Sequence, residues 1–192
     1  MKIFKGQVHP LIDVRASLER DDDMSFIPLM EKHHDFMKES IRVLLDKECL
    51  PNEKQAQLGR FLHLLAMHSK AEEETLYLAL KTARFKLARV EGARAQDEHD
   101  IAAQLSEELK DTGFESIWTE EIEAKAQVLG NLVFNHMEEE ETETFGTAKK
   151  DLSREELKVL RDEYMDQCRF HLDEELSVSP TVMNENRPNR AF

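Results

Sequence analysis

His68-Ser69-Lys70-Ala71-Glu72-Glu73 is the stretch around which the rest of the chain is organised. A histidine and a glutamate stand four residues apart in a segment with helical periodicity, so both side chains lie on one helix face, one turn apart. An imidazole and a carboxylate in that arrangement can hold one metal ion, or one each of two neighbouring ions. Taken alone, the pair is explained equally well as an ordinary surface pair that supports a helix.

The same pattern returns in the second half of the chain as His136-Met137-Glu138-Glu139-Glu140-Glu141. A lone histidine precedes each pair by the length of one helical hairpin. The chain therefore contains an internal repeat, in which each of two hairpins presents a histidine and then His-x-x-x-Glu. With pseudo-twofold symmetry, the two hairpins would direct six side chains at one point between the helices, and we interpret them as metal ligands: His34, His68, Glu72, His99, His136 and Glu140.

The first of these ligands has a neighbour with the same chemistry, since His33 and His34 are adjacent. His34 continues the apolar seam formed by Met30, Met37 and Ile41 at helical spacing, whereas His33 does not. We therefore favour His34, and His33 stays open as the alternative.

Composition narrows the class of protein. The 192 residues are 40% apolar and 34% charged, with only 6 glycines and 5 prolines, which is typical of a mostly helical soluble domain. A formal charge of −14 argues against nucleic acid as a partner, because phosphate-binding surfaces need the opposite sign. No apolar run is long enough to span a membrane, and residues 1–10 lack the apolar core of a signal peptide. Cys49 and Cys168 form no Cys-x-x-Cys pair, so we expect reduced thiols and a cytoplasmic location.

Apolar periodicity, caps and breakers predict the elements. We expect helices over about 25–47, 53–82, 95–109 and 116–145, then a fifth helix from a capping box at 153–156 to about 175. The domain organisation expected is an N-terminal extension over 1–24 with a short helix, a bundle with its C-terminal helix over 25–176, and a flexible tail over 177–192. Short connections make neighbouring helices antiparallel, so the fold predicted is all-α, an up-down-up-down four-helix bundle.

Four imidazoles and two carboxylates in one core require a cation, because burying them unpaired is costly. The mixture of nitrogen and oxygen ligands suits iron, manganese or zinc. Two glutamates can bridge two ions, and an oxo or hydroxo bridge would give each a fifth ligand while leaving room for a small molecule. The outer ring nitrogen of each histidine would need an acceptor, for which Glu73 and Glu141 are candidates. A ferritin-like site would need Glu-x-x-His on two helices, and only Glu31-x-x-His34 is present.

The spacing of these residues resembles the hemerythrin-like (HHE cation-binding) family over about residues 25–160. The resemblance rests on a six-residue set with its flanks: His34, His68-x-x-x-Glu72-Glu73-x-x-x-Tyr77, Glu98-His99, His136-x-x-x-Glu140-Glu141, Phe145, and Leu152-Ser153-x-Glu155-Glu156-Leu157. It implies a four-helix bundle with a non-haem di-iron centre that binds or senses dioxygen, nitric oxide or peroxide.

Two departures from the oxygen-carrying members bear on function. Those members have a fifth histidine four residues after the third, where this chain has Ala103. Their last acidic ligand is an aspartate five residues after the histidine, where this chain has Glu141; Glu140 matches bacterial and sensor-type relatives instead. Besides binding or sensing an oxidant, two other functions are therefore open. One is a di-iron enzyme of oxidative or nitrosative stress defence, which consumes peroxide or repairs iron–sulphur clusters. The other is an iron- or oxygen-responsive regulatory module.

Overall fold

The structure is a computed structural model that describes residues 24–178, with side chains to residue 174. Within this range every regular element is helical, as predicted from the sequence, and no described helix is long and apolar enough to cross a membrane. The predicted N-terminal extension with its short helix, and nearly all of the predicted tail, lie outside the described residues. The elements in order are α2 (Phe26–Leu45), α3 (Pro51–Glu74), α4 (Leu76–Thr82), α5 (Lys86–Lys110), α6 (Glu120–Glu139), the π-helix η1 (Glu140–Thr144), α7 (Phe145–Asp151) and α8 (Arg154–Val178).

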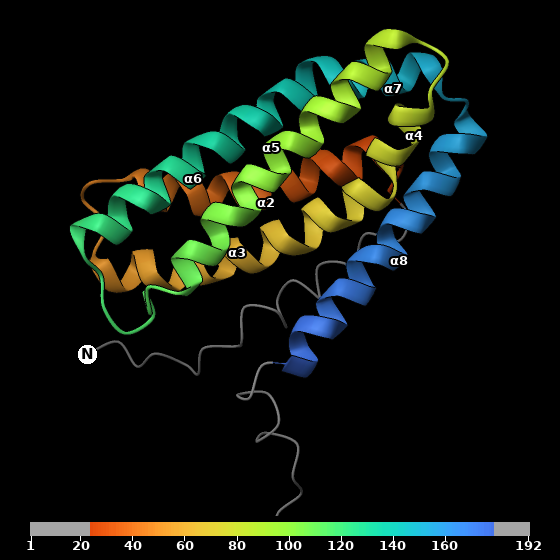
Figure 1. Cartoon of the computed structure of the whole chain (residues 1–192). Helices are drawn as coiled ribbons and strands as arrows, with labels where there is room; N and C mark the ends of the chain where they lie inside the picture. The colour runs from red at the N-terminus through yellow and green to blue at the C-terminus, as the bar shows by residue number, and fades with distance from the viewer. Residues whose placement is uncertain (1–23, 179–192) are drawn as a thin grey trace, which may run out of the picture.

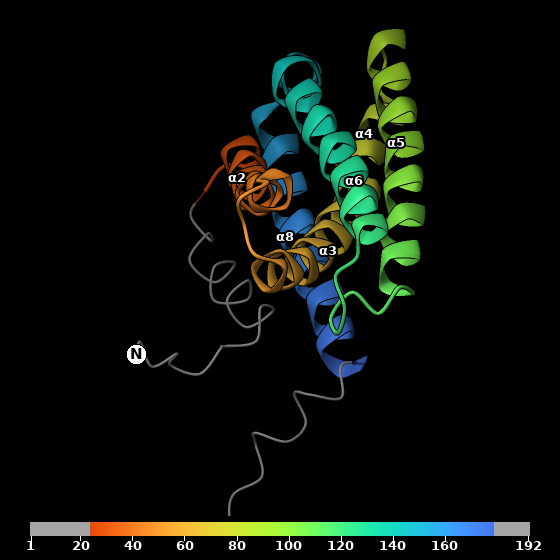
Figure 2. The ribbon, with the colours of Figure 1, turned by 90° about the vertical axis from the view of Figure 1, so that its left-hand side faces the viewer.

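Four long helices, α2, α3, α5 and α6, lie side by side, and the chain reverses direction from each to the next (Figure 1). Helix α2 packs against α3 and α6, and α5 packs against α6 and α4 (Figure 2). The fifth long helix, α8, packs mainly on α3. The seam predicted on α2 faces this core, since all six of its residues are buried: Ile27, Met30, His34, Met37, Ile41 and Leu44.

The helix expected over residues 53–82 is interrupted at Thr75, where φ is −125° and ψ is −84°. The Thr75 hydroxyl donates a hydrogen bond to the carbonyl of Ala71 at 2.6 Å, a local bond that competes with the helical ladder. The break comes three residues after Glu72. In an unbroken α-helix, residue 77 would point about 140° away from residue 72. After the break, the Tyr77 side chain lies inside the bundle and is fully buried.

The helix expected over residues 116–145 also differs from the prediction, because it is irregular and ends later. At Glu140 it widens into the π-helix η1, and it then continues as α7 to Asp151. A π-turn inserts an extra residue into the helical repeat, and such turns occur often at functional sites. As a result Phe145, five residues after Glu140, is buried inside the bundle. Each of the two glutamates is therefore followed by a helix irregularity and then, five residues on, by an inward aromatic side chain.

Helix α5 begins at Lys86, nine residues before its predicted start. Gly92 lies inside this helix, in the part that precedes the predicted start. A Cβ atom at position 92 would lie 3.0 Å from the Cβ of Leu80 and 3.4 Å from the backbone oxygen of Tyr77. Gly92 thus permits the close approach of α4 to α5, which holds Tyr77 in place.

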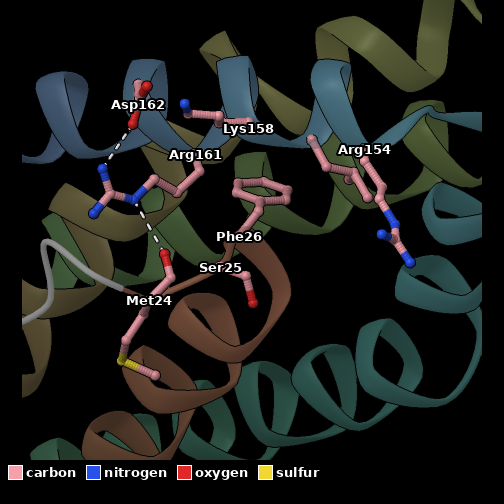
Figure 3. A pocket seen from close by; sticks show the side chains of 8 residues that line it. Met24, Ser25, Phe26, Arg154, Lys158, Arg161 and Asp162 are labelled. Carbon is pink, nitrogen blue, oxygen red and sulfur yellow. Dashed lines mark hydrogen bonds and ion pairs between the residues drawn. The ribbon is translucent and has the colours of Figure 1, made fainter.

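Helix α8 begins at the predicted capping box. Ser153 Oγ accepts from the backbone N–H of Glu156 at 3.2 Å, and the Glu156 carboxylate accepts from the Ser153 N–H at 2.7 Å. Further along, Arg161 Nε donates to the carbonyl of Met24 at 3.1 Å and ties α8 to the start of α2 (Figure 3). A surface pocket lies between these two elements, and it is lined by Met24, Ser25, Phe26, Arg154, Leu157, Lys158, Arg161 and Asp162.

Candidate metal centre

The six side chains interpreted as ligands come from α2, α3, α5, α6 and η1, and the structure brings all of them together. Each is at most 7% exposed. Their ligand-capable atoms form two compact groups, in each of which all atoms lie within 4.8 Å of one another. The first group contains His34, His68, Glu72 and Glu140, and the second contains Glu72, His99 and His136. Glu72 belongs to both groups, so its carboxylate lies between the two halves of the cluster.

Several of the inward atoms approach one another closely without forming a hydrogen bond. His68 Nε2 lies 3.2 Å from Glu72 Oε2, and His34 Nε2 lies 3.4 Å from Glu140 Oε2. Within the described part of the chain, four buried inward atoms have no hydrogen-bond partner: His34 Nε2, His68 Nε2, Glu72 Oε1 and Glu140 Oε2. Unpaired buried polar atoms are costly and rare. A cation at this point would satisfy all four at once, so the donor set fits a bound metal.

Two outer ring nitrogens have the carboxylate partners predicted from the sequence. Glu141 Oε1 accepts from His34 Nδ1 at 2.8 Å, and Glu73 Oε1 accepts from His99 Nδ1 at 3.1 Å. An ionised carboxylate can only accept, so Nδ1 carries the hydrogen in both rings. In a neutral imidazole this leaves the Nε2 lone pair pointing into the cluster, as a metal ligand requires.

The other two outer partners were missed. Glu98 Oε2 accepts from His136 Nδ1 at 2.7 Å, although the sequence analysis used Glu98 only as a flank of the motif. The Tyr164 hydroxyl lies 2.6 Å from His68 Nδ1 and 2.7 Å from the Nδ1 of His33. Tyr164 lies on α8, far along the chain, and no local spacing connects it to His68. His33 meets this hydroxyl and not the cluster, so it is His34 that enters the site.

Electrostatics show that the cluster is short of positive charge. Burial alone would lower the pKa of His34, but the neighbouring Glu140 carboxylate and the hydrogen bond to Glu141 outweigh it and raise the pKa to about 9. Burial and the neighbouring Glu140 charge raise the pKa of Glu72 to about 8. Burial works against ionisation of Glu140 as well, but the surrounding histidines, His136 foremost, hold its pKa below the usual value. The raised pKa values of His34 and Glu72 mean that protons offset part of the negative charge here, which a metal ion could offset instead.

Two aromatic residues complete the inner wall. The Tyr77 hydroxyl lies 3.0 Å from His99 Nε2, 3.0 Å from His136 Nε2 and 2.7 Å from Glu140 Oε1. Phe145 stacks on the ring of His34, with centroids 5.5 Å apart and planes at 25°. Neither residue could be placed in the site from its spacing, because both face inward only through the helix irregularities after Glu72 and Glu140.

Two further positions were weighed from the sequence. Ala103, where an oxygen-carrying member would have its fifth histidine, is exposed, and its neighbour Ala102 is the buried residue. A side chain at 103 therefore points away from the cluster in this bundle. Glu31, which a ferritin-like site would use, is also exposed, so the structure gives that architecture no support.

Comparison with known proteins agrees with this geometry. The model of the family described as Hemerythrin HHE cation binding domain matches residues 25–148, which is well over half of the chain. The matched range contains all six clustered residues and ends before α8, so Tyr164 lies outside it. Neither the curated proteins nor the solved structures contain a match to this chain. On the family match, the chain belongs to the hemerythrin HHE cation-binding domain family.

Proposed function

We propose that the cluster binds two iron ions and that the loaded centre binds or senses dioxygen or a related small oxidant, such as nitric oxide or peroxide. The ions would be held by His34, His68, Glu72, His99, His136 and Glu140. The observation that carries this proposal is the set of buried inward atoms that lack any hydrogen-bond partner. Such atoms are retained in a core when a cation pairs them.

The two overlapping groups of ligand-capable atoms support the proposed number of ions. Glu72 Oε2 lies 3.2 Å from His68 Nε2 on one side and 3.5 Å from His99 Nε2 on the other. A carboxylate between two pairs of imidazoles is suited to bridging two ions. Iron is the metal we favour, with manganese and zinc as alternatives, since imidazole and carboxylate ligands suit all three.

Two further predictions have support from the structure. The alternating helix directions support the predicted up-down-up-down bundle, and the free thiols of Cys49 and Cys168 support the predicted cytoplasmic location.

Iron supplies this site with redox chemistry and a place for a small molecule to bind. The chain supplies the surroundings. All six ligands are buried, so bulk water is kept out and only a small molecule can reach the centre. The outer carboxylates of Glu73, Glu98 and Glu141 hold the imidazole rings in the ligating tautomer.

A second candidate function is catalysis on the same centre, either peroxide consumption or iron–sulphur cluster repair. It is favoured by the outward orientation of Ala103, because no side chain at that position can act as the fifth histidine of an oxygen carrier. A centre with fewer histidine ligands is more exposed to oxidation, and it is therefore better suited to reaction than to reversible binding.

One experiment tests both candidates. The whole chain is loaded anaerobically with ferrous iron, the bound metal is counted, and the protein is then mixed with oxygen. We expect two ions per chain. Return of the ferrous spectrum on degassing supports binding, whereas immediate oxidation with turnover of added peroxide supports catalysis. A chain that takes up no iron under these conditions contradicts the proposed function altogether.

A further inference from the structure

The Tyr77 hydroxyl occupies the space between the second pair of histidines, and this inference about it rests on the proposed function. We propose that the phenol oxygen of Tyr77 binds, as a phenolate, the metal ion held by His99 and His136. Tyr77 would then be a seventh protein ligand, and it would bind the ion of His99, the histidine that lies four residues before the position of the missing fifth histidine. The iron–oxygen bond forms as the O–H bond breaks, and the proton is released to solvent.

Geometry is the first argument. His99 Nε2, His136 Nε2 and the Tyr77 hydroxyl form a triangle in which all three edges are 3.0 Å. Two donor atoms bound at right angles to one ion, each at about 2.1 Å, lie about 3.0 Å apart. The triangle therefore has the size of one face of an octahedral coordination sphere, of which the tyrosine oxygen would be the third corner.

Hydrogen-bond counting is the second argument. The phenol has one hydrogen, but four possible acceptors surround it, because Glu140 Oε1 and Glu72 Oε2 lie 2.7 and 3.4 Å away in addition to the two ring nitrogens. Because Nδ1 of His99 and Nδ1 of His136 each donate to a carboxylate, a neutral ring at either position would direct its Nε2 lone pair toward the other ring and toward the phenol. One hydrogen cannot satisfy these atoms, whereas a cation facing all of them can.

The backbone supplies the third argument. The side chain points inward only because α3 breaks at Thr75, and α4 lies close to α5 only because residue 92 is a glycine. Both features direct a fully buried phenol at metal-binding atoms. If Tyr77 were only a packing residue, its single hydrogen would leave most of the polar atoms around its hydroxyl unsatisfied.

The proposal makes the two metal positions unequal. The His99 and His136 position gains a ligand from Tyr77, while the corresponding residue on the other side, Phe145, offers only a ring face to His34. The open coordination position then lies beside His34 and His68, under Phe145.

The test uses the fact that the chain contains only two tyrosines, Tyr77 and Tyr164. The full chain is loaded with ferrous iron, oxidised, and examined by visible absorption and resonance Raman spectroscopy. We expect a phenolate-to-ferric charge-transfer band and enhanced phenolate ring modes. In Tyr77→Phe the band and modes disappear. In the matched control, Tyr164→Phe, both remain, because the Tyr164 hydroxyl faces the outer ring nitrogens.

The outcomes separate this proposal from the proposed function. Wild-type protein that holds two ferric ions but shows no phenolate modes overturns the ligand assignment and leaves the di-iron centre intact, whatever the variants do. Loss of the modes in Tyr164→Phe but not in Tyr77→Phe also overturns it. Wild-type protein without iron instead contradicts the proposed function. The assignment is supported if Tyr77→Phe loses the ion at His99 and His136 and keeps the other ion.

Discussion

The two halves of the cluster come from the same sequence pattern but differ in their surroundings. In the first half, His34 and His68 meet Glu141, the Tyr164 hydroxyl and the Phe145 ring. In the second half, His99 and His136 meet two carboxylates, those of Glu73 and Glu98, and the Tyr77 hydroxyl. A repeat in the sequence pattern therefore does not make two equivalent sites, since the residues five positions after each glutamate, Tyr77 and Phe145, differ.

The outer partners sharpen the difference. A carboxylate that accepts from Nδ1 makes the ring a stronger ligand, whereas a neutral phenol does so less. The second half is supported by residues of the matched domain itself. One support of the first half comes from α8, a helix beyond the family match. The first half therefore depends on the docking of α8, and the second does not.

The largest expected effect comes from breaking both halves at once through Glu72, which belongs to both groups of ligand-capable atoms. We expect Glu72→Ala to weaken binding of both ions by more than about a hundredfold, beyond the effect of losing an outer partner. Anaerobic iron titration of the whole chain measures this. The control is Glu74→Ala, which removes an exposed carboxylate two residues away. Equal iron content in Glu72→Ala and wild type would mean that this carboxylate does not bridge.

The next largest effect is expected from removing one histidine, which should abolish metal binding in one half of the cluster only. His136→Ala should leave the ion of the first half in place, and His68→Ala should leave that of the second, so each variant binds one ion where the wild type binds two. Metal analysis after removal of loosely bound iron gives the ratio. Loss of both ions from each variant would show instead that the halves load only together.

Removing a residue that hydrogen-bonds the outer ring nitrogen of a histidine should have a smaller effect on metal affinity, and only in the half of the cluster that contains this histidine. Tyr164→Phe removes the partner of His68, and Glu98→Gln weakens that of His136. Each change should reduce affinity for one ion about 10- to 100-fold and leave the other unchanged. Competition with a chelator of known affinity resolves the two steps. If Tyr164→Phe weakens both ions equally, α8 supports the whole cluster and not the first half alone.

The smallest expected effect is on the pH dependence of the metal-free chain. The pKa of His34 rises to about 9 from a usual 6.5, and that of Glu72 to about 8 from 4.5. Both groups hold more protons folded than unfolded, so they stabilise the fold at lower pH and this stability is lost as the pH rises through about 8 to 9. Urea unfolding with chelator present should therefore give a lower free energy of unfolding at pH 9 than at pH 7.

The matched control for this prediction is His34→Asn, which should reduce the loss between pH 7 and pH 9 because one of the two titrating groups is gone. Metal-loaded protein should show little of the effect, since the cation replaces the protons. A metal-free chain whose stability rises from pH 7 to pH 9 would contradict the proton balance described for this cluster.

Sequence periodicity was sufficient to predict the helical class and the convergence of six side chains, because a seam such as that of α2 repeats the spacing of a regular helix. It was insufficient wherever regularity ends. Tyr77 and Phe145 face the cluster through a break at Thr75 and a π-helix at Glu140, and a 3.6-residue repeat assigns both to other faces. Tyr164 was missed for a different reason, since its contact with His68 depends on how α8 packs on α3.

The central claim is that the cluster holds two ions in unequal surroundings, and Mössbauer spectroscopy of the whole chain loaded with isotopically enriched iron tests it most directly. We predict two ferric quadrupole doublets of equal area, one for the position with Tyr77 and one for the position beside Phe145. In Tyr77→Phe the two doublets should move closer together. A single doublet in wild-type protein would contradict the inequality of the two halves, and a spectrum without bound iron would contradict the di-iron centre itself.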